Sequence, residues 1–408
     1  MKVLFITLVK IDNIECYGIY SDLLRKFRNE GHDVTIVCPN ERKHNGSTTL
    51  LKKNGVSILK VWTTNIQKTN FFEKGITTLL IEFFFLFAIK KHLNYRDYNL
   101  IIYSTPPITF TNLISWLKKK SRSKTYLLLK DIFPQNAVDL NMIKADGLIY
   151  NFFRNKEKQL YKISNFIGCM SLANLNYLLD KNPELNNSKI EINPNSIEVQ
   201  ENLSINISKN TILSKYNIPN NKTLFLFGGN LGRPQGIEFL IKNISNCKQI
   251  KEAFFLIIGN GTEYKNISNK IKFEELNNVI LIKELPYLDY EKILKCAHVG
   301  LIFLNPNFTI PNFPSRILNY MHNKMPVICA TDLITDIGMI AQKNSFGYSC
   351  LTSDYDSFYD FVIKLLNNEV REKMGINAYN FLKNEYSVEG SYNKIIEKCY
   401  ARNILNFK

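Results

Sequence analysis

The segment from Asn312 to Asp332, NFPSRILNYMHNKMPVICATD, has residue types that suit a phosphate-binding site. Pro314 fits the first turn of a helix, where its missing N–H costs nothing. Ser315 and Arg316 then lie at the helix N-terminus, where free backbone N–H groups and the helix dipole attract anions. Arg316 adds a planar, permanent cation. An ordinary helix followed by a buried strand explains the same pattern, so these residues alone leave both interpretations open.

A glycine-rich run, FGGNLGRPQGIEFLI, follows a predicted strand at residues 224–227 and opens a predicted helix. Glycines such as Gly229 and Gly236 allow a sharp turn and a close approach of the backbone to a phosphate. Arg233 adds positive charge to the same loop. The spacing is not that of the dinucleotide-binding fingerprint, so the run by itself could be a simple turn.

Two further strand ends carry candidate binding residues. IIGNGTEY places Gly259 and Gly261 after a strand, and Pro286 and Tyr287 follow the next strand along the chain. Ligands of open α/β sheets bind at the carboxyl ends of strands, which is where these residues fall. The alternative is a plain strand-to-helix turn.

In the first half of the chain, LKDIFPQNAVDL places Asp131 directly after a predicted strand at residues 126–129. A carboxylate at that position could accept a hydrogen bond from a substrate hydroxyl. Aspartate is also a favoured helix N-cap, and this alternative stays open. Gly18, in ECYGIYSDLL, opens the first predicted helix.

Short apolar runs alternate with helical patterns in both halves of the chain, which predicts two doubly wound parallel sheets. We expect domains at residues 1–200 and 201–408, joined by a polar linker at 196–220. The region from residue 355 onward is predicted to be mainly helical. The predicted strands are 3–8, 34–37, 58–62, 100–103, 126–129, 166–170, 224–227, 254–258, 279–282, 299–304 and 327–330.

The chain of 408 residues has a net charge of +16. Residues 1–200 carry 28 basic and 17 acidic side chains, so they hold +11 of this excess. Clusters such as Lys90-Lys91 and 118–120 could meet anionic lipid or an anionic substrate, or could be a solvated surface. The most apolar segment, 76–89, is too short to span a bilayer. It predicts a buried helix, or a helix with an apolar face that enters a membrane surface.

The eight cysteines form no C-x-x-C pair, which argues against a zinc site or a disulfide framework and favours a reducing cytoplasm. No nucleic-acid recognition motif is present. The N-terminal run MKVLFITLVK predicts a strand and lacks a signal-peptide cleavage pattern.

These motifs together resemble family 4 glycosyltransferases, which are retaining enzymes of the GT-B fold. Pro314, Ser315 and Arg316 match the P-S-[KR]-x-x-E-Y-M core of that family, and the strand that follows matches G-K-P-V-I. Two positions depart from the pattern. Asn319 replaces the glutamate that holds the ribose, and Pro311 replaces the glutamate that touches the donor sugar.

The glycine-rich run resembles the family loop G-R-L-x-x-x-K-G, with Asn230 and Gln235 in place of its two cations. A G-N-[IL]-G-x-x-Q-G loop and a D-[IL]-[FW]-P segment are typical of a branch that acts on bacterial surface polysaccharides and includes fucosamine-transferase-like enzymes. The resemblance implies two Rossmann-like domains: an N-terminal domain that binds the acceptor and a C-terminal domain that binds the nucleotide-sugar donor. It also implies that the last helix returns to the N-terminal domain, and the candidate for that helix is 377–402.

The resemblance also implies the residue roles. Catalysis falls to Asp131, Arg233 and Arg316. The donor, expected to be a UDP-sugar, contacts Gly18, Gly229, Asn230, Gln235, Gly236, Gly259, Gly261, Pro286, Tyr287, Pro314, Ser315 and Asn319. No metal cofactor is expected, and Asp332 and Asp336 are interpreted as loop or cap residues that could also contact the sugar.

The implied acceptor is a polyprenyl-diphosphate-linked saccharide used for capsule or O-antigen assembly. We therefore expect a cytoplasmic protein, peripheral on the inner face of the plasma membrane. A GT-B UDP-sugar epimerase and a non-enzymatic nucleotide- or nucleic-acid-binding protein are the alternatives. The first needs acidic catalytic residues that have no evident place here, and the second leaves the glycine loops without a role.

Overall fold

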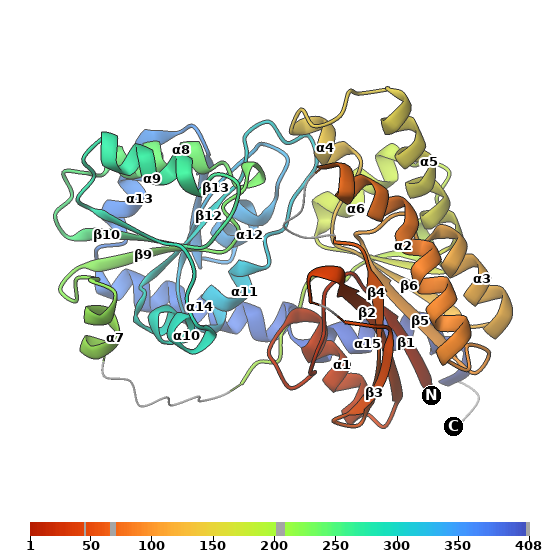
Figure 1. Cartoon of the computed structure of the whole chain (residues 1–408). Coiled ribbons are helices and arrows are strands. Elements are labelled where there is room, and N and C mark those ends of the chain that lie inside the picture. Colours follow the sequence, from red (N-terminus) through yellow and green to blue (C-terminus); the bar gives the residue numbers. More distant parts are fainter. Residues whose placement is uncertain (45, 66–70, 201–208, 405–408) are drawn as a thin grey trace. The chain divides into compact units, whose positions relative to one another are not determined.

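The computed structural model describes residues 1–408 except 45, 66–70, 201–208 and 405–408 (Figure 1). The chain divides into two compact units. The N-terminal domain is Met1–Glu198 together with the segment that begins at Ser387, and the C-terminal domain is Val199–Tyr386. The division lies two residues before the predicted boundary of 200.

The N-terminal domain contains an eight-stranded sheet in the order β3-β4-β2-β1-β5-β6-β7-β8. Its strands are β1 (Lys2–Ile6), β2 (Asp33–Glu41), β3 (Thr49–Lys53), β4 (Val56–Thr63), β5 (Leu100–Ser104), β6 (Lys124–Leu129), β7 (Phe166–Cys169) and β8 (Ile190–Ile192). All neighbours pair in parallel, as with Val3 opposite Val34, except that β3 is antiparallel to β4. The parallel strands are apolar because helices cover both faces of the sheet.

Helices cover the two faces of this sheet in two layers (Figure 1). The buried apolar side chains of one helix layer belong to one hydrophobic core cluster, and those of the other layer belong to a second cluster. The first layer is α2 (Phe71–His92), α3 (Thr111–Ser121), α5 (Leu148–Ile163) and α6 (Leu172–Lys181), and the second is α1 (Ile19–Asn29) and α15 (Val388–Ile404). A short helix, α4 (Gln135–Asp139), precedes α5.

The C-terminal domain contains a six-stranded parallel sheet in the order β11-β10-β9-β12-β13-β14. Its strands are β9 (Thr223–Gly228), β10 (Ala253–Ile258), β11 (Val279–Ile282), β12 (Val299–Phe303), β13 (Val327–Thr331) and β14 (Gly347–Leu351). Its helices are α7 (Lys209–Lys215), α8 (Ile237–Asn246), α9 (Tyr264–Phe273), α10 (Tyr287–Cys296), α11 (Arg316–His322), α12 (Ile337–Lys343), α13 (Tyr355–Lys364) and α14 (Asn368–Glu385).

All eleven predicted strands are present within one to four residues at their ends, which confirms two doubly wound sheets. Three strands were missed: β3, β8 and β14. β3 is an edge strand with exposed side chains, β8 has three residues, and β14 has few buried ones, so none shows a continuous apolar run.

Two predicted segments need correction. The linker at 196–220 contains helix α7, which buries Ile212 and Leu213, and its residues 201–208 lie outside the described residues. The single helix at 377–402 is two helices, because α14 ends at Glu385 and α15 begins at Val388. The N–H of Val388 donates to Ile197, so the chain enters the N-terminal domain at this break. Within the described residues, no helix has the length and apolar character needed to cross a bilayer.

Candidate functional site

The candidate donor residues of the C-terminal domain follow the carboxyl ends of β9, β10, β11 and β12, at one edge of the sheet. From β9 the chain continues to β10 and β11 on one side, and then to β12 on the other side of β9. This reversal of strand order is the topological switch point at which open α/β sheets bind ligands. The loops that leave β9 and β12 therefore form the centre of the candidate site.

Arg316 is the first residue of α11, and it lies against the loop after β9. Its guanidinium is 4.4 Å from the ring centroid of Phe227, and Nη2 donates a hydrogen bond to Oε1 of Gln235. Its Nη1 atom is buried and has no hydrogen-bond partner among the described residues. Burial lowers the pKa of this guanidinium, which remains charged because the ordinary pKa of arginine is so high. No carboxylate of the described chain pairs with it.

The loop after β9 brings two of its predicted donor residues to Arg316: Gly229, whose backbone lies beside the guanidinium, and Gln235. Gln235 contacts the guanidinium, whereas the side chain of Asn230 is exposed. The side chain of Arg233 is 72% exposed, and its Nε is 3.8 Å from a carboxylate oxygen of Glu263. Arg233 is therefore a solvated cation at the rim, in contrast to the buried cation at Arg316.

The glycines at this edge are required by the packing of two loops. A Cβ atom on Gly259 would lie 1.8 Å from the carbonyl oxygen of Gly229, and one on Gly261 would lie 2.3 Å from that of Leu231. The two loops are also joined by a hydrogen bond of 3.0 Å from the N–H of Leu231 to the carbonyl of Asn260. These contacts explain both glycines without any ligand.

The loop after β9 also passes close to the end of β12. Gly236 has φ 55°, and a Cβ atom there would lie 2.6 Å from the carbonyl oxygen of Leu304. The N–H of Asn305 donates to the carbonyl of Pro234 at 3.0 Å. The loops after β9 and β12 lie on either side of the switch point, and a glycine at position 236 allows them to pack against each other.

The start of α11 differs from the prediction at one residue. Pro314 precedes the N-cap residue Ser315 and so lies just before the first turn of α11, although Ser315 already has the helical dihedrals φ −62° and ψ −18°. The Ser315 side chain is exposed and makes no capping hydrogen bond. Asn319 is exposed one turn later, and Pro311 is buried. Ser315 and Asn319 are therefore accessible to a ligand from solvent.

The turn after β11 lies beside the turn after β10. Nδ2 of Asn260 donates to Oε1 of Glu284 at 2.8 Å, which joins the two turns. Pro286 is the N-cap residue of α10, and the side chain of Tyr287 is 55% exposed. An exposed aromatic ring at this edge is a surface on which a base could stack.

Asp332 and Asp336 follow β13. The carboxylate of Asp332 accepts hydrogen bonds from the N–H groups of Ile334 and Thr335, and Asp336 is the N-cap residue of α12. Asp332 therefore serves as a loop residue, whereas Asp336 occupies the N-cap position of α12 without a side-chain capping hydrogen bond. Among the described residues, no three His, Cys, Asp or Glu side chains are placed to hold a metal ion.

In the N-terminal domain, Asp131 follows β6 as predicted. Its N–H donates to Oγ1 of Thr105 at 3.1 Å, which ties the end of β6 to the end of β5. The alternative that Asp131 caps a helix is wrong, because α4 begins at Gln135 with Pro134 as its N-cap residue. The residue is exposed, and its carboxylate makes no hydrogen bond or ion pair within the described chain.

Lys130 was missed by the sequence analysis. Its Nζ atom is 3.4 Å from the carbonyl oxygen of Asn193, and it forms no ion pair among the described residues. Burial lowers the pKa of this ammonium group to about 7. The available signal was a lysine that ends the apolar strand YLLL, next to a candidate catalytic carboxylate.

Gly18 is the N-cap residue of α1. Its N–H donates to Oδ1 of Asp22 at 3.0 Å, and the same oxygen is 2.6 Å from Nη2 of Arg25. Arg25 also pairs with Glu198 at 2.9 Å. The turn that contains Gly18 is therefore held by charges of the protein itself. The i,i+3 spacing of Asp22 and Arg25 was visible in the sequence, but Glu198 was not an evident partner.

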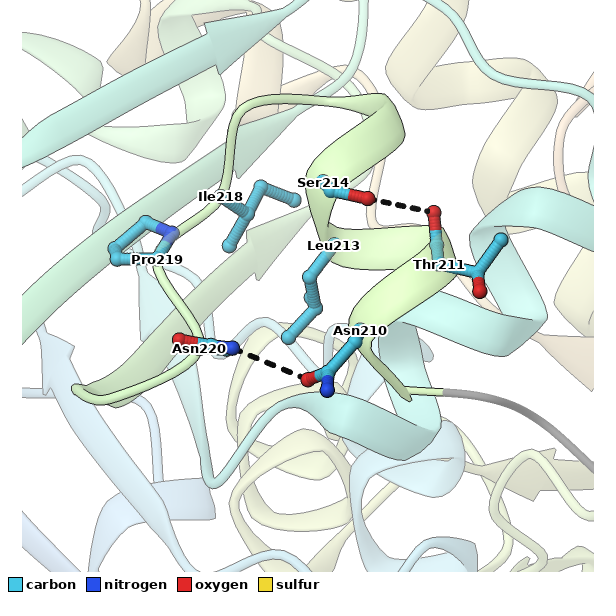
Figure 2. A pocket seen from close by; sticks show the side chains of 7 residues that line it. All are labelled: Asn210, Thr211, Leu213, Ser214, Ile218, Pro219 and Asn220. Atoms are coloured by element: carbon cyan, nitrogen blue, oxygen red, sulfur yellow. Dashed lines mark hydrogen bonds between the residues drawn. The ribbon is translucent and has the colours of Figure 1, made fainter.

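A pocket lies between α7 and the start of β9 (Figure 2). Its lining is Asn210, Thr211, Leu213, Ser214, Ile218, Pro219 and Asn220. Nδ2 of Asn220 donates to Oδ1 of Asn210 at 3.1 Å, and Oγ of Ser214 donates to the carbonyl of Thr211 at 3.2 Å. The pocket contains no titratable side chain and lies at the amino end of β9, away from the strand ends that carry the candidate site.

Comparison with known proteins finds similarity in sequence and in fold. Residues 208–381 match the family model described as glycosyl transferases group 1. The probable glycosyltransferase WbjE of Pseudomonas aeruginosa is 23% identical over 276 residues, which are 66% of this chain and 66% of that protein. The chain thus spans slightly less than two thirds of the length of this relative.

Two solved structures cover the chain almost completely. Sucrose-phosphate synthase from Thermosynechococcus elongatus has a TM-score of 0.74 at 14% identity and covers 100% of both chains. Anabaena HepE in complex with UDP and glucose has a TM-score of 0.68 at 13% identity, covering 98% of this chain and 100% of that chain. The predicted fold, two parallel-sheet α/β domains of the GT-B type, is confirmed. The segment matched by the family model contains every candidate donor residue except Gly18.

Proposed function

We propose that this chain is a retaining glycosyltransferase that moves a sugar from a UDP-sugar to a lipid-linked saccharide during assembly of a bacterial surface polysaccharide. The family model over residues 208–381 and the name of the Pseudomonas relative support sugar transfer. The structure of HepE with UDP and glucose supports UDP as the nucleotide. The surface-polysaccharide role and the retaining course rest on the motif resemblance.

The observation that carries the proposal is the environment of Arg316. A charged group in a partly buried position is costly unless its hydrogen bonds are satisfied. Here Nη1 is buried and has no partner among the described residues, at the switch point of the sheet. The diphosphate of a nucleotide-sugar would supply the missing acceptor oxygens, since guanidinium groups bind phosphate through parallel N–H···O bonds.

In the proposed reaction, a hydroxyl oxygen of the acceptor forms a bond to the anomeric carbon of the donor sugar. The bond between that carbon and the diphosphate oxygen breaks, and its electron pair stays on the diphosphate. The hydroxyl proton passes to the departing phosphate oxygen. Arg316, the rim cation Arg233 and the backbone at Ser315 would neutralise the leaving charge.

The remaining roles follow from position. Asn319, exposed on α11, would hold the ribose, and Tyr287 would lie against the base. In the N-terminal domain, Asp131 would bind the acceptor hydroxyl. The proposal assigns neutralisation of the leaving group to arginines rather than to a resident metal. A polyprenyl-diphosphate-linked acceptor would place the enzyme on the cytoplasmic face of the membrane.

The test is thermal denaturation with UDP, GDP, ADP and UDP-sugars, comparing wild type with Arg316→Met. Methionine fills space without charge, so the variant should fold. UDP at 100 times its dissociation constant should add about 2.7 kcal/mol to the stability of wild type. Arg316→Met should show no UDP response at that concentration.

The matched control is Arg371→Gln. Arg371 is a half-buried arginine of the same domain, bonded to the carbonyls of Leu365 and Leu366. Its variant should keep the full UDP response. A wild-type protein that responds to no nucleotide would contradict the proposal. UDP-sugar conversion without any acceptor would favour the epimerase alternative.

A further inference from the structure

Helix α2 is apolar on two opposite faces. On the face toward the sheet, Ile81, Phe85 and Ile89 are fully buried in the core cluster. Its only described acidic residue, Glu82, is also buried, and its carboxylate accepts hydrogen bonds from Asn112 and the N–H of Leu113. Packing in the core therefore accounts for the apolar residues on one face of α2 but not for those on the other.

The outward face of α2 exposes four large apolar side chains. Leu79 is 49% exposed, Leu80 40%, Phe83 51% and Phe87 65%. Their spacing of one, three and four residues places them along one side of the helix. We call these four residues the α2 apolar face. The opposite helix layer, α1 and the described part of α15, exposes no large apolar side chain. Exposed apolar helix residues therefore lie on the α2 side of this sheet, where the start of α5 also exposes Leu148, Ile149 and Phe152.

The α2 apolar face ends in basic residues. Lys90 and Lys91 are exposed in the last turn of α2. Nζ of Lys90 lies 5.0 Å from the ring centroid of Trp116, which brings α3 and its exposed Lys119 and Lys120 to the same end. The nearby carboxylate of Asp97 is already paired with Lys2 at 3.1 Å. Apolar side chains beside several lysines suit the surface of a bilayer that contains anionic lipid.

We propose that the α2 apolar face inserts into the headgroup region of an anionic membrane, with the lysines at the ends of α2 and α3 on the lipid phosphates. The net charge of +11 on residues 1–200 favours this occupant over a second copy of the chain, because two such surfaces would repel each other. The inference gives a physical site to the membrane partner in the proposed function. It does not depend on nucleotide binding.

The chain has a built-in reporter for this surface. Both of its tryptophans flank α2: Trp62 packs on Phe84 with ring centroids 5.6 Å apart, and Trp116 lies under Lys90. Tryptophan emission therefore reports on this region alone. We would mix the full chain with phosphatidylcholine vesicles containing 0% or about 30% phosphatidylglycerol, with and without acyl chains brominated near the headgroup.

For wild type we expect a blue shift and bromine quenching on the anionic vesicles only. Phe83→Gln with Phe87→Gln should weaken vesicle binding about tenfold or more through loss of apolar area. Lys90→Gln with Lys91→Gln should weaken it about tenfold and reduce its salt dependence. The matched control is Phe273→Gln with Met339→Gln, which removes two exposed apolar side chains from the C-terminal domain and should bind as wild type does.

Three results would overturn the inference: no binding to anionic vesicles, binding that the phenylalanine variant leaves unchanged, or a dimer in solution that the phenylalanine variant dissociates. The UDP response separates this inference from the proposed function. Arg316→Met should still bind vesicles, and the phenylalanine variant should still respond to UDP.

Discussion

The two domains each contain a strand-to-helix turn that is held by an arginine, and the two arginines differ in how they are satisfied. In the N-terminal domain, Arg25 holds the turn between β1 and α1. In the C-terminal domain, Arg316 contacts the turn between β9 and α8 through Gln235. Both turns begin at the carboxyl end of a central strand, so their positions within the two sheets are alike.

The guanidinium of Arg25 has ion-pair and hydrogen-bond partners within the protein. It pairs with Asp22 and Glu198 and donates to the carbonyls of Ile14 and Cys16. Arg316 has Gln235 as its hydrogen-bonding partner and an aromatic ring against its face, while Nη1 has no partner in the described part of the chain. The difference distinguishes an arginine that stabilises a turn from one that can bind an anion. Three predictions test this distinction.

The largest effect is expected for Arg25→Met. The substitution leaves the carboxylate of Asp22, which is 2% exposed, without its cation. Loss of one partner of a buried ion pair costs about 3–5 kcal/mol in unfolding free energy. In the absence of nucleotide, Arg316→Met should change stability by less than about 1 kcal/mol, because it removes a poorly satisfied charge. Urea denaturation of both variants measures the contrast, and equal losses would show that the two arginines are equivalent.

Two glycines should differ in the opposite direction from the arginines: Gly259, in the turn after β10 of the C-terminal domain, should tolerate a side chain less well than Gly18, in the turn between β1 and α1. Gly259→Ala forces a Cβ atom onto the carbonyl oxygen of Gly229, a backbone atom that cannot move without parting the loops. We expect a loss of about 2–3 kcal/mol in unfolding free energy.

Gly18→Ala is the matched control for Gly259→Ala. Gly18 has an extended φ of 163°, and the nearest atom to an added Cβ is Oγ of Ser21 at 3.9 Å. Its stability should change by no more than about 0.5 kcal/mol. A lower affinity of this variant for UDP-sugar, measured by titration calorimetry, would support Gly18 as a donor contact. A large loss of stability would contradict the control.

The last prediction concerns the pH dependence of stability at Lys130, which like Arg316 has no carboxylate partner among the described residues. Its pKa of about 7 in the folded protein is below the ordinary 10.5. Between these values the unfolded chain binds a proton that the folded chain does not, so unfolding free energy rises with pH. The rise is at most about 1.4 kcal/mol per pH unit. The Lys130→Met variant should lack this rise in unfolding free energy, which urea denaturation at pH 7, 8 and 9 measures. Parallel pH profiles would mean that Lys130 titrates normally.

The alternation of strands and helices, and hence both sheets, followed from apolar runs such as 100–103 and 254–258. Such runs are long because parallel strands covered on both faces need apolar side chains throughout. The donor motifs could likewise be placed at strand ends, because a turn must follow each strand. Strands whose side chains are exposed or only partly buried, such as β3 and β14, lacked that pattern and were missed.

The sequence by itself determined the order of the elements, the residue types at the strand ends and the basic excess of the N-terminal half. Only the tertiary structure decided which arginine is satisfied, since Glu198 reaches Arg25 from 173 residues away. It also decided that Gly259 packs against the backbone of Gly229, and that one apolar face of α2 is exposed to solvent. Periodicity cannot reveal these features, because burial and pairing depend on which distant segments the fold brings into contact.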